Sequence, residues 1–301
     1  MLDTVRNVAR IRKALGHTVH MSPPIQYLDT EHPDLNAVLG REGRGIPYGA
    51  LIELYGASSL GKTALGLDLA GIAQRDGAVC WWADFENSFD PEWAKARGVN
   101  LKPMYFFEQY MGMFEKERSP RLATVQEVIE EIEKVMAAVK AKAPDAKFFG
   151  VVDSLAAMLT DTEASAGITG AGGFKAQMSH PTFMGRWLRR WVSLCKSMSC
   201  TVVLINQTRT NPMQMFGNPE YTPGGNPPKF YTHVRARLSR MKKGRVMRKG
   251  KPVGILTTVT AVKSKLGSEG AKCGYRMMYS GGSSFMTIDE LKEKLDAENG
   301  E

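Results

Sequence analysis

Residues 56–70 read GASSLGKTALGLDLA and directly follow the apolar run 50–55. Residues 56–63 fit the pattern Gly-x4-Gly-Lys-Thr of a phosphate-binding loop, or P-loop. The match is specific because the loop lies between a short apolar run, typical of a buried strand, and a stretch that favours a helix. Main-chain N–H groups of such a loop and of the following helix surround phosphate oxygens. The stretch therefore predicts a nucleoside triphosphate site.

The whole loop is expected to contact this ligand. Lys62 would neutralise β- and γ-phosphate oxygens, and the hydroxyl of Thr63 would ligate Mg²⁺. The predicted nucleotide-binding residues of the loop are Gly56, Ala57, Ser58, Ser59, Leu60, Gly61, Lys62, Thr63 and Ala64.

Three polar residues downstream complete the predicted site. Asp153 ends the apolar run FFGVVD and is expected to be the second metal ligand, because the run lies downstream of a P-loop. Glu86, in WWADFENSFD, follows another apolar run and is expected to orient the attacking water, the alternative being a solvated strand end. Gln207 follows VVLIN, where it could bond the γ-phosphate and move the next segment when that phosphate is lost.

The apolar pattern predicts an α/β fold. Short apolar runs predict buried parallel strands at 50–55, 78–84, 104–107, 148–153 and 201–206. Helices are predicted between them at 63–74, 124–142 and 183–198, the second opened by the capping box Thr124-x-x-Glu127. Antiparallel strands are predicted at one edge, at 231–241, 253–263 and 272–279. We expect a P-loop NTPase core with a mostly parallel, twisted sheet flanked by helices.

The core is expected to span residues 35–281. A short basic helix and a linker precede it at 1–34, and a short acidic helix or tail follows at 282–301. Two segments of the core, about 163–176 and 208–228, contain stretches too rich in Gly or Pro for regular structure. Their length calls for a functional explanation.

The charge distribution favours a polyanionic partner. The chain carries a formal net charge of +9, and residues 235–251 hold nine bases and no acid. A phosphate backbone is a natural counterpart of that segment, although a solvated hairpin turn would have the same composition. No apolar run approaches the roughly 20 residues that cross a bilayer, which argues against a membrane partner.

The four cysteines form no C-x-x-C pair, and no signal peptide opens the chain. These features argue against secretion and against a metal site built from cysteine and histidine. A cytoplasmic location is expected, in a bacterium or in the host of a bacteriophage.

Five further motifs occur in a recognisable order between residues 35 and 279. They are FGVVDS, INQTR, FGNPEYTPGG, KFYTHVR and VKSK. With these motifs and the P-loop, the sequence resembles the RecA family of DNA strand-exchange recombinases, in a compact and possibly bacteriophage-encoded form. The family's C-terminal domain would be absent or reduced to the acidic segment 282–301.

The resemblance implies that the nucleotide is ATP, bound with Mg²⁺, and assigns roles to residues outside the P-loop. Asp90 and Trp93 would contact the adenine, with the indole stacked on the base, and Tyr279 would pack near the same nucleotide. Lys263 and Lys265 would reach across a subunit interface to the ATP of a neighbouring copy.

Further residues would lie at that interface in a helical filament. They are Lys229 and Phe230. The helix within 1–34 would bind the next protomer.

The resemblance also assigns the segments 163–176 and 208–228 to DNA, as loops that line the filament axis. Lys175 and Arg209 would contact phosphates, and apolar side chains at 213–216 would wedge between bases, unless they pack in the core. The predicted DNA-binding residues are Lys175, Arg209, Met213, Met215, Phe216, Gly217, Asn218, Gly224 and Gly225.

The expected function is a DNA-dependent ATPase that forms filaments on single-stranded DNA and exchanges strands with a homologous duplex. A hexameric helicase motor with the same core is the first alternative. The second is a protein that coats single-stranded DNA, or recruits partners to it, without exchange.

Overall fold

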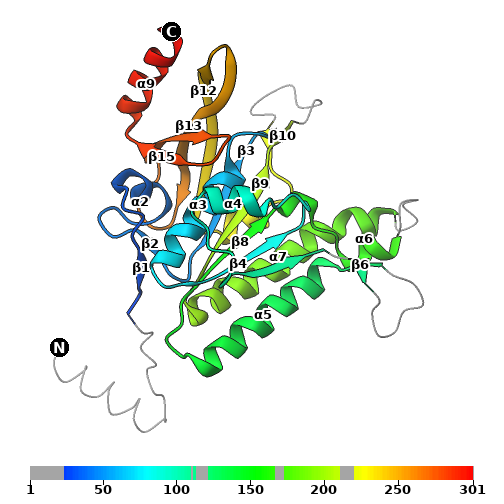
Figure 1. Cartoon of the computed structure of the whole chain (residues 1–301). Helices are drawn as coiled ribbons and strands as arrows, with labels where there is room; N and C mark the ends of the chain where they lie inside the picture. The colour runs from blue at the N-terminus through cyan, green and yellow to red at the C-terminus, as the bar shows by residue number, and fades with distance from the viewer. Residues whose placement is uncertain (1–23, 110, 113–120, 167–172, 211–219, 301) are drawn as a thin grey trace, which may run out of the picture.

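A nine-stranded sheet forms the centre of the molecule (Figure 1). The computed structural model describes residues 24–109, 111–112, 121–166, 173–210 and 220–300. The strand order is β15-β14-β13-β12-β3-β9-β8-β4-β5, and the pairs from β12 to β5 are parallel whereas those from β15 to β12 are antiparallel. The strands are β3 (Leu51–Gly56), β4 (Val79–Asp84), β5 (Tyr105–Glu108), β8 (Phe148–Asp153), β9 (Cys200–Gln207), β12 (Val234–Arg248), β13 (Lys251–Ser264), β14 (Lys272–Met278) and β15 (Ser283–Met286). The predicted α/β fold class is confirmed.

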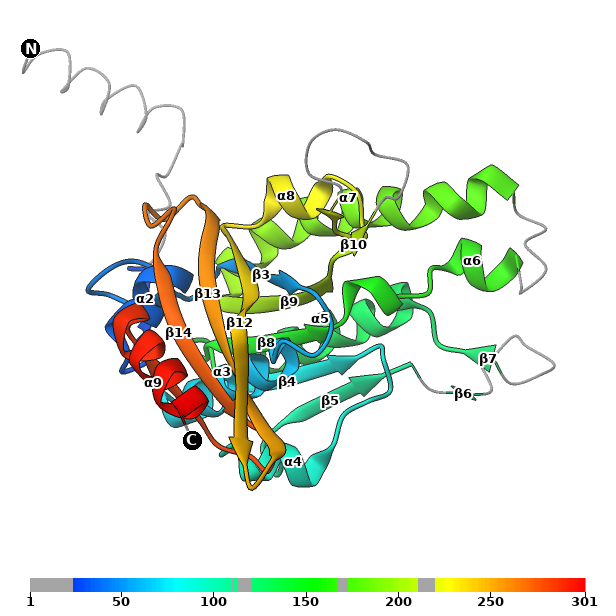
Figure 2. The same ribbon diagram turned by 90° about the horizontal axis from the view of Figure 1, so that it is seen from above.

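Helices cover both faces of the parallel half of the sheet (Figure 2). On one face lie α3 (Lys62–Arg75) and α4 (Pro91–Ala96), and on the other α5 (Val125–Lys142) and α7 (Gly173–Met198), whereas α2 (Pro33–Leu39) packs against β12, β13 and β14. The predicted capping box opens α5, where the Thr124 N–H donates to the Glu127 carboxylate at 2.8 Å.

Adjacent residues of each parallel strand supply the two apolar layers. Trp82 of β4 belongs to the layer beneath α3, whereas Trp81 belongs to the layer beneath α5 and α7. Gly150 of β8 is needed beside Trp81, because a Cβ atom there would lie 2.0 Å from the indole ring. Packing of large rings against small residues therefore helps to fix the register between neighbouring strands.

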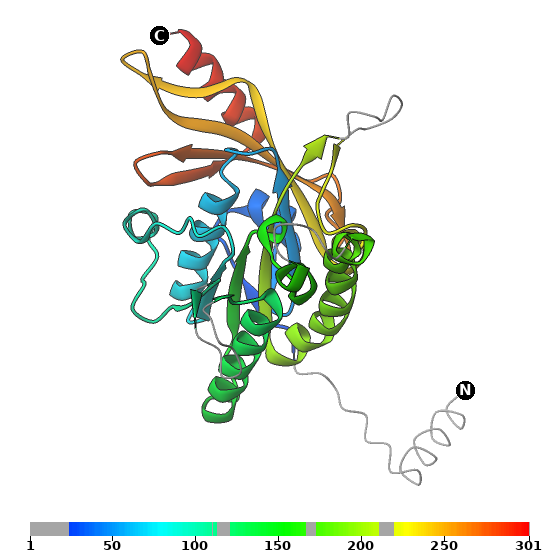
Figure 3. The ribbon, with the colours of Figure 1, turned by 90° about the vertical axis from the view of Figure 1, so that its right-hand side faces the viewer.

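The antiparallel half extends beyond this body. Figure 3 shows the β12–β13 hairpin and α9 (Ile288–Gly300) projecting together from the rest of the ribbon. Leu291 of α9 packs with Val246, Leu256 and Met286 in a small apolar cluster. The basic stretch 235–251 thus forms one arm and the turn of a hairpin, with exposed bases at Arg240, Lys242, Arg245, Arg248, Lys249 and Lys251.

Short elements complete the described chain. They are β1 (Tyr27–Leu28), β2 (Ile46–Pro47), β6 (Met111–Gly112), β7 (Arg121–Leu122), the 3-10 turn η1 (Leu155–Ala157), α6 (Asp161–Ala166), β10 (Arg209–Thr210), β11 (Glu220–Tyr221) and α8 (Pro227–Tyr231). Among the described residues, none of the helices is both long and apolar enough to span a bilayer.

The two Gly- and Pro-rich segments contain more regular structure than their composition predicted. Helix α7 begins at Gly173, well before the predicted start at 183, and includes Pro181. The segment 163–176 therefore contains the end of α6 and the start of α7. The ends of the segment 208–228 pair as β10 and β11. Composition did not predict these elements because tertiary contacts, of α6 with α7 and of β10 with β11, override local propensity. Most of the predicted helix and linker at 1–34 lies outside the described residues, which begin at 24.

Candidate functional site

A cavity of about 420 Å³ opens at the carboxyl ends of the parallel strands. Parallel strands end at the same edge of a sheet, so the residues that follow β3, β4, β8 and β9 meet there. The lining residues are Ser58, Ser59, Leu60, Gly61, Lys62, Thr63, Ala64, Glu86, Ser88, Trp93, Asp153, Ile205, Gln207, Met277 and Tyr279.

The P-loop joins β3 to α3, as the sequence predicted. Gly61 immediately precedes α3 with φ of 84°, in the left-handed region that glycine adopts without strain. At Gly56, an added Cβ atom would lie 2.4 Å from the Leu238 carbonyl oxygen. The side chain of Leu60 is buried among the apolar residues under the loop. Both glycines are therefore required by backbone shape or close approach.

Lys62 lies folded back onto its own loop. Its Nζ donates to the carbonyl oxygens of Gly56 at 3.2 Å and Ala57 at 2.7 Å. Burial lowers the pKa of Lys62, while Asp153 and Glu86 act in the opposite direction. A phosphate anion in the cavity would compete for the same ammonium group, which is the only side-chain cation that lines the cavity among the described residues.

Thr63 and Asp153 meet at the base of the cavity. The Thr63 hydroxyl donates to Asp153 Oδ2 at 2.7 Å. Burial raises the pKa of Asp153 to about 7, although the bond from Thr63 opposes the shift. A hydroxyl beside a buried carboxyl fits Mg²⁺, which prefers oxygen ligands and takes its remaining ones from phosphates and water. Within the described ranges no group of three or more His, Cys, Asp or Glu residues could hold a metal by itself.

Glu86 and Gln207 are brought together from two strand ends. Gln207 Nε2 donates to Glu86 Oε1 at 2.9 Å, and the Ser154 hydroxyl donates to the same oxygen. The loop that carries Glu86 is shaped by buried Asp84, whose carboxylate accepts main-chain N–H groups of residues 86, 88 and 89 at 2.8–3.0 Å. The predicted water-orienting residue and phosphate sensor therefore share one hydrogen bond.

Two of the three residues predicted to lie near the adenine, Trp93 and Tyr279, line the cavity, whereas Asp90 does not. The indole N–H of Trp93 donates to the Tyr279 carbonyl oxygen at 3.2 Å. Asp90 caps α4 and accepts the N–H of Trp93 at 3.1 Å. The guanidinium of Arg97 lies 4.8 Å from the Trp93 ring centroid. Three contacts thus hold the indole beside the phosphate loop.

Lys263 and Lys265 lie on the far side of β3 from Gln207. Lys263 Nζ donates to the main-chain carbonyls of Lys229 at 2.5 Å and Thr232 at 2.9 Å, and Lys265 Nζ donates to that of Phe230 at 2.7 Å. Burial, then the charge of Lys265, lowers the pKa of Lys263 to about 8. Phe230 is 67% exposed. We call these four residues, 229, 230, 263 and 265, the lysine corner.

The structure places only part of the predicted DNA-binding set. Arg209 is exposed on β10, and Gly224 and Gly225 have φ of 91° and 70° in the turn before α8. Lys175 lies in the first turn of α7. Residues Met213, Met215, Phe216, Gly217 and Asn218 lie outside the described residues.

Several polar residues of the site were missed in the sequence. They are Asp84, Ser154 and Arg97. Ser154 and Arg97 act through contacts with residues far away in sequence: Ser154 meets Glu86, and Arg97 meets Asp68 at 3.3 Å and the Tyr275 hydroxyl at 2.8 Å. Asp84 could have been identified, because it is an acid at the end of an apolar run, but the catalytic role was assigned to Glu86 instead. No sequence pattern pointed to Ser154 or Arg97.

The comparisons with known proteins agree with this geometry. Residues 9–284 match the sequence model of the RecA N-terminal domain. The chain is 31% identical over 283 residues to Protein RecA of Rickettsia africae, covering 94% of this chain and 74% of that protein. It is 33% identical over 242 residues to Protein RecA of Paramagnetospirillum magneticum, covering 80% of this chain and 60% of that protein. The chain therefore belongs to the RecA family of DNA recombination proteins.

Proposed function

We propose that this protein is an ATP-dependent recombinase that forms filaments on single-stranded DNA, pairs them with a homologous duplex and exchanges strands. One observation carries the proposal. Gln207 bonds Glu86 in the cavity at 2.9 Å, and the segment predicted to hold DNA begins at the next residue, Thr208. A change at the phosphate site would therefore reach the DNA segment over a very short stretch of chain.

In the proposed nucleotide cycle, Lys62 exchanges its carbonyl partners for β- and γ-phosphate oxygens. Thr63 and Asp153 would hold Mg²⁺, which would supply charge neutralisation at the phosphates. Glu86 orients water for in-line attack, and Gln207 bonds the γ-phosphate while it is present. Loss of that phosphate returns Gln207 to Glu86, the contact that the structure contains.

The adenine base would stack on Trp93, with Tyr279 at its edge. Asp90 supports this arrangement by holding the first turn of α4 through the N–H groups of Glu92 and Trp93. Its role at the base would then be to position Trp93.

Single-stranded DNA would lie against the segments 163–176 and 208–228. Arg209, Lys175, and the N–H groups of Gly224 and Gly225 would contact phosphates. Wedging of Met213, Met215 and Phe216 between bases, with Gly217 and Asn218 beside them, remains a prediction.

A neighbouring copy would supply the lysine corner to complete the ATP site. Phe230, exposed next to Lys229, would pack in the interface between copies, and residues 1–34 would grip the next protomer. The exposed bases of the β12–β13 hairpin would attract the incoming duplex, with weaker binding at higher salt. The cytoplasm of a bacterium, or of a phage-infected host, is where these partners occur together.

A joint-molecule assay tests this proposal. Homologous and heterologous duplexes are offered with and without ATP, beside electron micrographs of the protein on single strands. Products that require both homology and ATP are expected. Unwinding without exchange would favour the helicase motor, and DNA-stimulated ATPase without joint molecules would favour the coating protein.

A further inference from the structure

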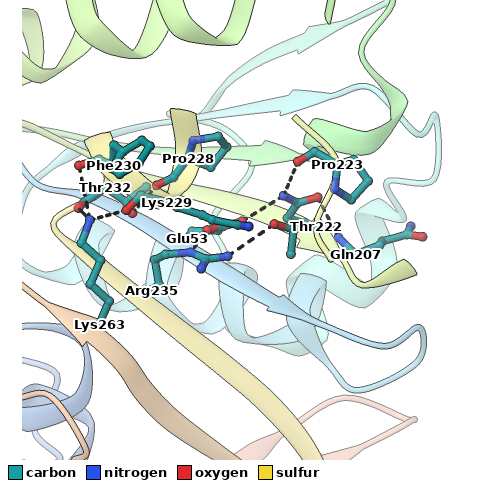
Figure 4. A network of polar contacts seen from close by, with 11 residues as sticks. Glu53, Gln207, Thr222, Pro223, Pro228, Lys229, Phe230, Thr232, Arg235 and Lys263 are labelled. Carbon is teal, nitrogen blue, oxygen red and sulfur yellow. Dashed lines mark hydrogen bonds and ion pairs between the residues drawn. The ribbon is translucent and has the colours of Figure 1, made fainter. Parts of the chain in front are cut away.

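A buried carboxylate, Glu53, lies between the phosphate site and the lysine corner (Figure 4). It belongs to the central strand β3 and is 0% exposed. Asn206 Nδ2 donates to Glu53 Oε1 at 2.9 Å, and Arg235 Nε donates to Glu53 Oε2. The nucleotide cycle proposed above gives this carboxylate no role.

These residues form a polar row across four neighbouring strands. Asn206 is on β9, Glu53 on β3, Arg235 on β12 and Lys263 on β13. Arg235 is the ladder partner of Glu53 on one side and of Lys263 on the other. The row therefore runs from the residue before Gln207 to the lysine corner, through the middle of the sheet.

The same row is tied to the end of the segment 208–228. Asn206 Nδ2 also donates to the Pro223 carbonyl oxygen at 3.1 Å. Arg235 Nη2 donates to the hydroxyl of buried Thr222 at 3.4 Å. Each donor that satisfies Glu53 thus also contacts the returning end of the predicted DNA segment (Figure 4).

The other contacts leave this cluster little freedom to rearrange. The Gln207 N–H donates to Asn206 Oδ1 at 2.9 Å, so the amide of Asn206 is bound at both its oxygen and its nitrogen. The guanidinium of Arg235 lies 4.5 Å from the centroid of the Tyr55 ring. A buried carboxylate that loses one of its donors is left with an unsatisfied oxygen, which costs free energy. Movement of the Gln207 main chain would therefore displace Asn206 against Glu53, or carry the Pro223 end of the segment with it.

We propose that Glu53 is a positioning residue that couples Gln207 to the Thr222–Pro223 end of the DNA segment. It sets how strongly ATP changes the affinity for single-stranded DNA. The inference rests on the proposed function, because it concerns the link between the same two sites. Glu53 touches neither ligand and acts only through Asn206 and Arg235.

The test is Glu53→Gln in the full chain. The glutamine keeps the size of the side chain but replaces one acceptor with an N–H₂ group that faces a donor. The dissociation constant of a fluorescent oligothymidylate is measured with Mg²⁺ and either ATPγS or ADP. In the native protein the ADP value should exceed the ATPγS value by about tenfold or more, and in the variant by no more than about twofold. Binding of a fluorescent ATP analogue without DNA should change by less than about threefold.

Glu133→Gln is the matched control. Glu133 of α5 also accepts from an arginine, Arg190, and from a side-chain N–H, that of Trp191 at 2.8 Å. It joins α5 to α7, away from the row. The control should keep the native ratio of the two dissociation constants even if its melting temperature falls.

Thr222→Val tests the same link if Glu53→Gln does not fold. It keeps the shape of the side chain and removes only the hydroxyl that Arg235 contacts. It should lower the ratio by weakening binding with ATPγS, with the ADP value unchanged.

Four outcomes would overturn the inference. The first is that the ratio of the ADP and ATPγS dissociation constants stays native in Glu53→Gln, and the second, if that variant does not fold, is that it stays native in Thr222→Val. The third is that a folded variant weakens DNA binding equally with both nucleotides. The fourth is that Glu133→Gln abolishes the ratio as well. A native protein whose DNA affinity ignores the nucleotide would instead refute the proposed function itself, which is a separate and recognisable result.

Discussion

The phosphate cavity and the lysine corner lie on opposite sides of β3 and differ in the sign of their charge. Around the cavity, Asp84, Glu86 and Asp153 outnumber Lys62. At the corner, Lys263 and Lys265 donate to main-chain carbonyls, and neither forms an ion pair in the part of the chain that the structure describes. The cavity therefore carries an excess of acidic side chains, and the lysine corner an excess of basic ones.

The two kinds of strand pairing explain this difference. Parallel strands bring their carboxyl ends to one edge, so side chains from β4, β8 and β9 converge there. Strand β12 runs parallel to β3 and continues past that edge into the basic hairpin, and β13 returns antiparallel to β12 with Lys263 near its end. The residues proposed for catalysis therefore lie together at the phosphate cavity, whereas the lysine corner presents positive charge to another molecule. This segregation supports the proposal that ATP lies between copies.

The largest expected effect is that of Glu86→Gln on turnover. Loss of the carboxylate removes the group that orients water, so kcat should fall by about 10²- to 10⁴-fold. The glutamine can still contact Gln207, and filaments on single-stranded DNA should persist in electron micrographs. ATPase assays under saturating DNA give the rate. A variant with native turnover would remove Glu86 from the mechanism.

Mixing two inactive variants tests the charge comparison directly. Lys62→Ala lacks the phosphate lysine, and a Lys263→Ala/Lys265→Ala variant lacks the corner. Each alone should lose at least about tenfold in DNA-dependent ATPase activity. In an equimolar mixture about a quarter of the seams between copies would join an intact loop to an intact corner.

ATPase assays of the mixture should therefore show partial recovery, well above the sum of the two variants. Recovery should vanish when DNA is omitted and no filament forms. A mixture that stays as inactive as its components would indicate that each ATP lies within one copy.

Trp93→Ala should have a smaller effect, confined to affinity. Removing one stacked ring costs about 1–3 kcal/mol, so the dissociation constant for ATP should rise by about fivefold to a hundredfold. The kcat at saturating ATP should stay within about threefold, because the phosphate residues are untouched. Trp93→Tyr serves as the control and should recover most of the affinity. A drop in kcat with unchanged affinity would contradict the assignment.

The smallest expected effect is that of pH on the lysine corner. With its pKa lowered to about 8, Lys263 loses its charge as the pH rises from 7 to 9. ATP-dependent filament assembly should therefore weaken severalfold over this range, as measured by light scattering. Lys263→Arg keeps its charge throughout and should show a flatter profile.

The same group acts on stability with the opposite sign. The folded protein binds its proton less tightly than the unfolded chain does, so its contribution to the free energy of unfolding rises with pH above about 8. A parallel loss of assembly and of melting temperature would show global unfolding instead of titration of Lys263.

The sequence predicted the parallel strands and the P-loop closely. Strand β8 has the predicted bounds, and α3 begins one residue before the predicted start. Short apolar runs and glycine spacing are local patterns, so they can be recognised without knowing which strands are neighbours. Glu86 and Gln207 were also identified because each directly follows such a run.

The start of α7 and the paired ends of 208–228 were not predicted. The Arg209–Tyr221 ladder pair joins the two ends of a span of chain whose own composition favours no strand, and α7 packs against α6. Local propensity is weak there, and the surrounding fold decides.

The sequence by itself determined which residues could bind phosphate, because a P-loop is one continuous stretch of chain and can be recognised from its local sequence. Only the tertiary structure decided that Gln207 bonds Glu86. It also decided that Glu53 accepts from both Asn206 and Arg235, and that Arg235 in turn contacts Thr222. These partners are separated by more than a hundred residues, or arise from a loop with no regular pattern. Whether a buried charge is satisfied depends on where donors lie in space, which spacing along the chain does not encode.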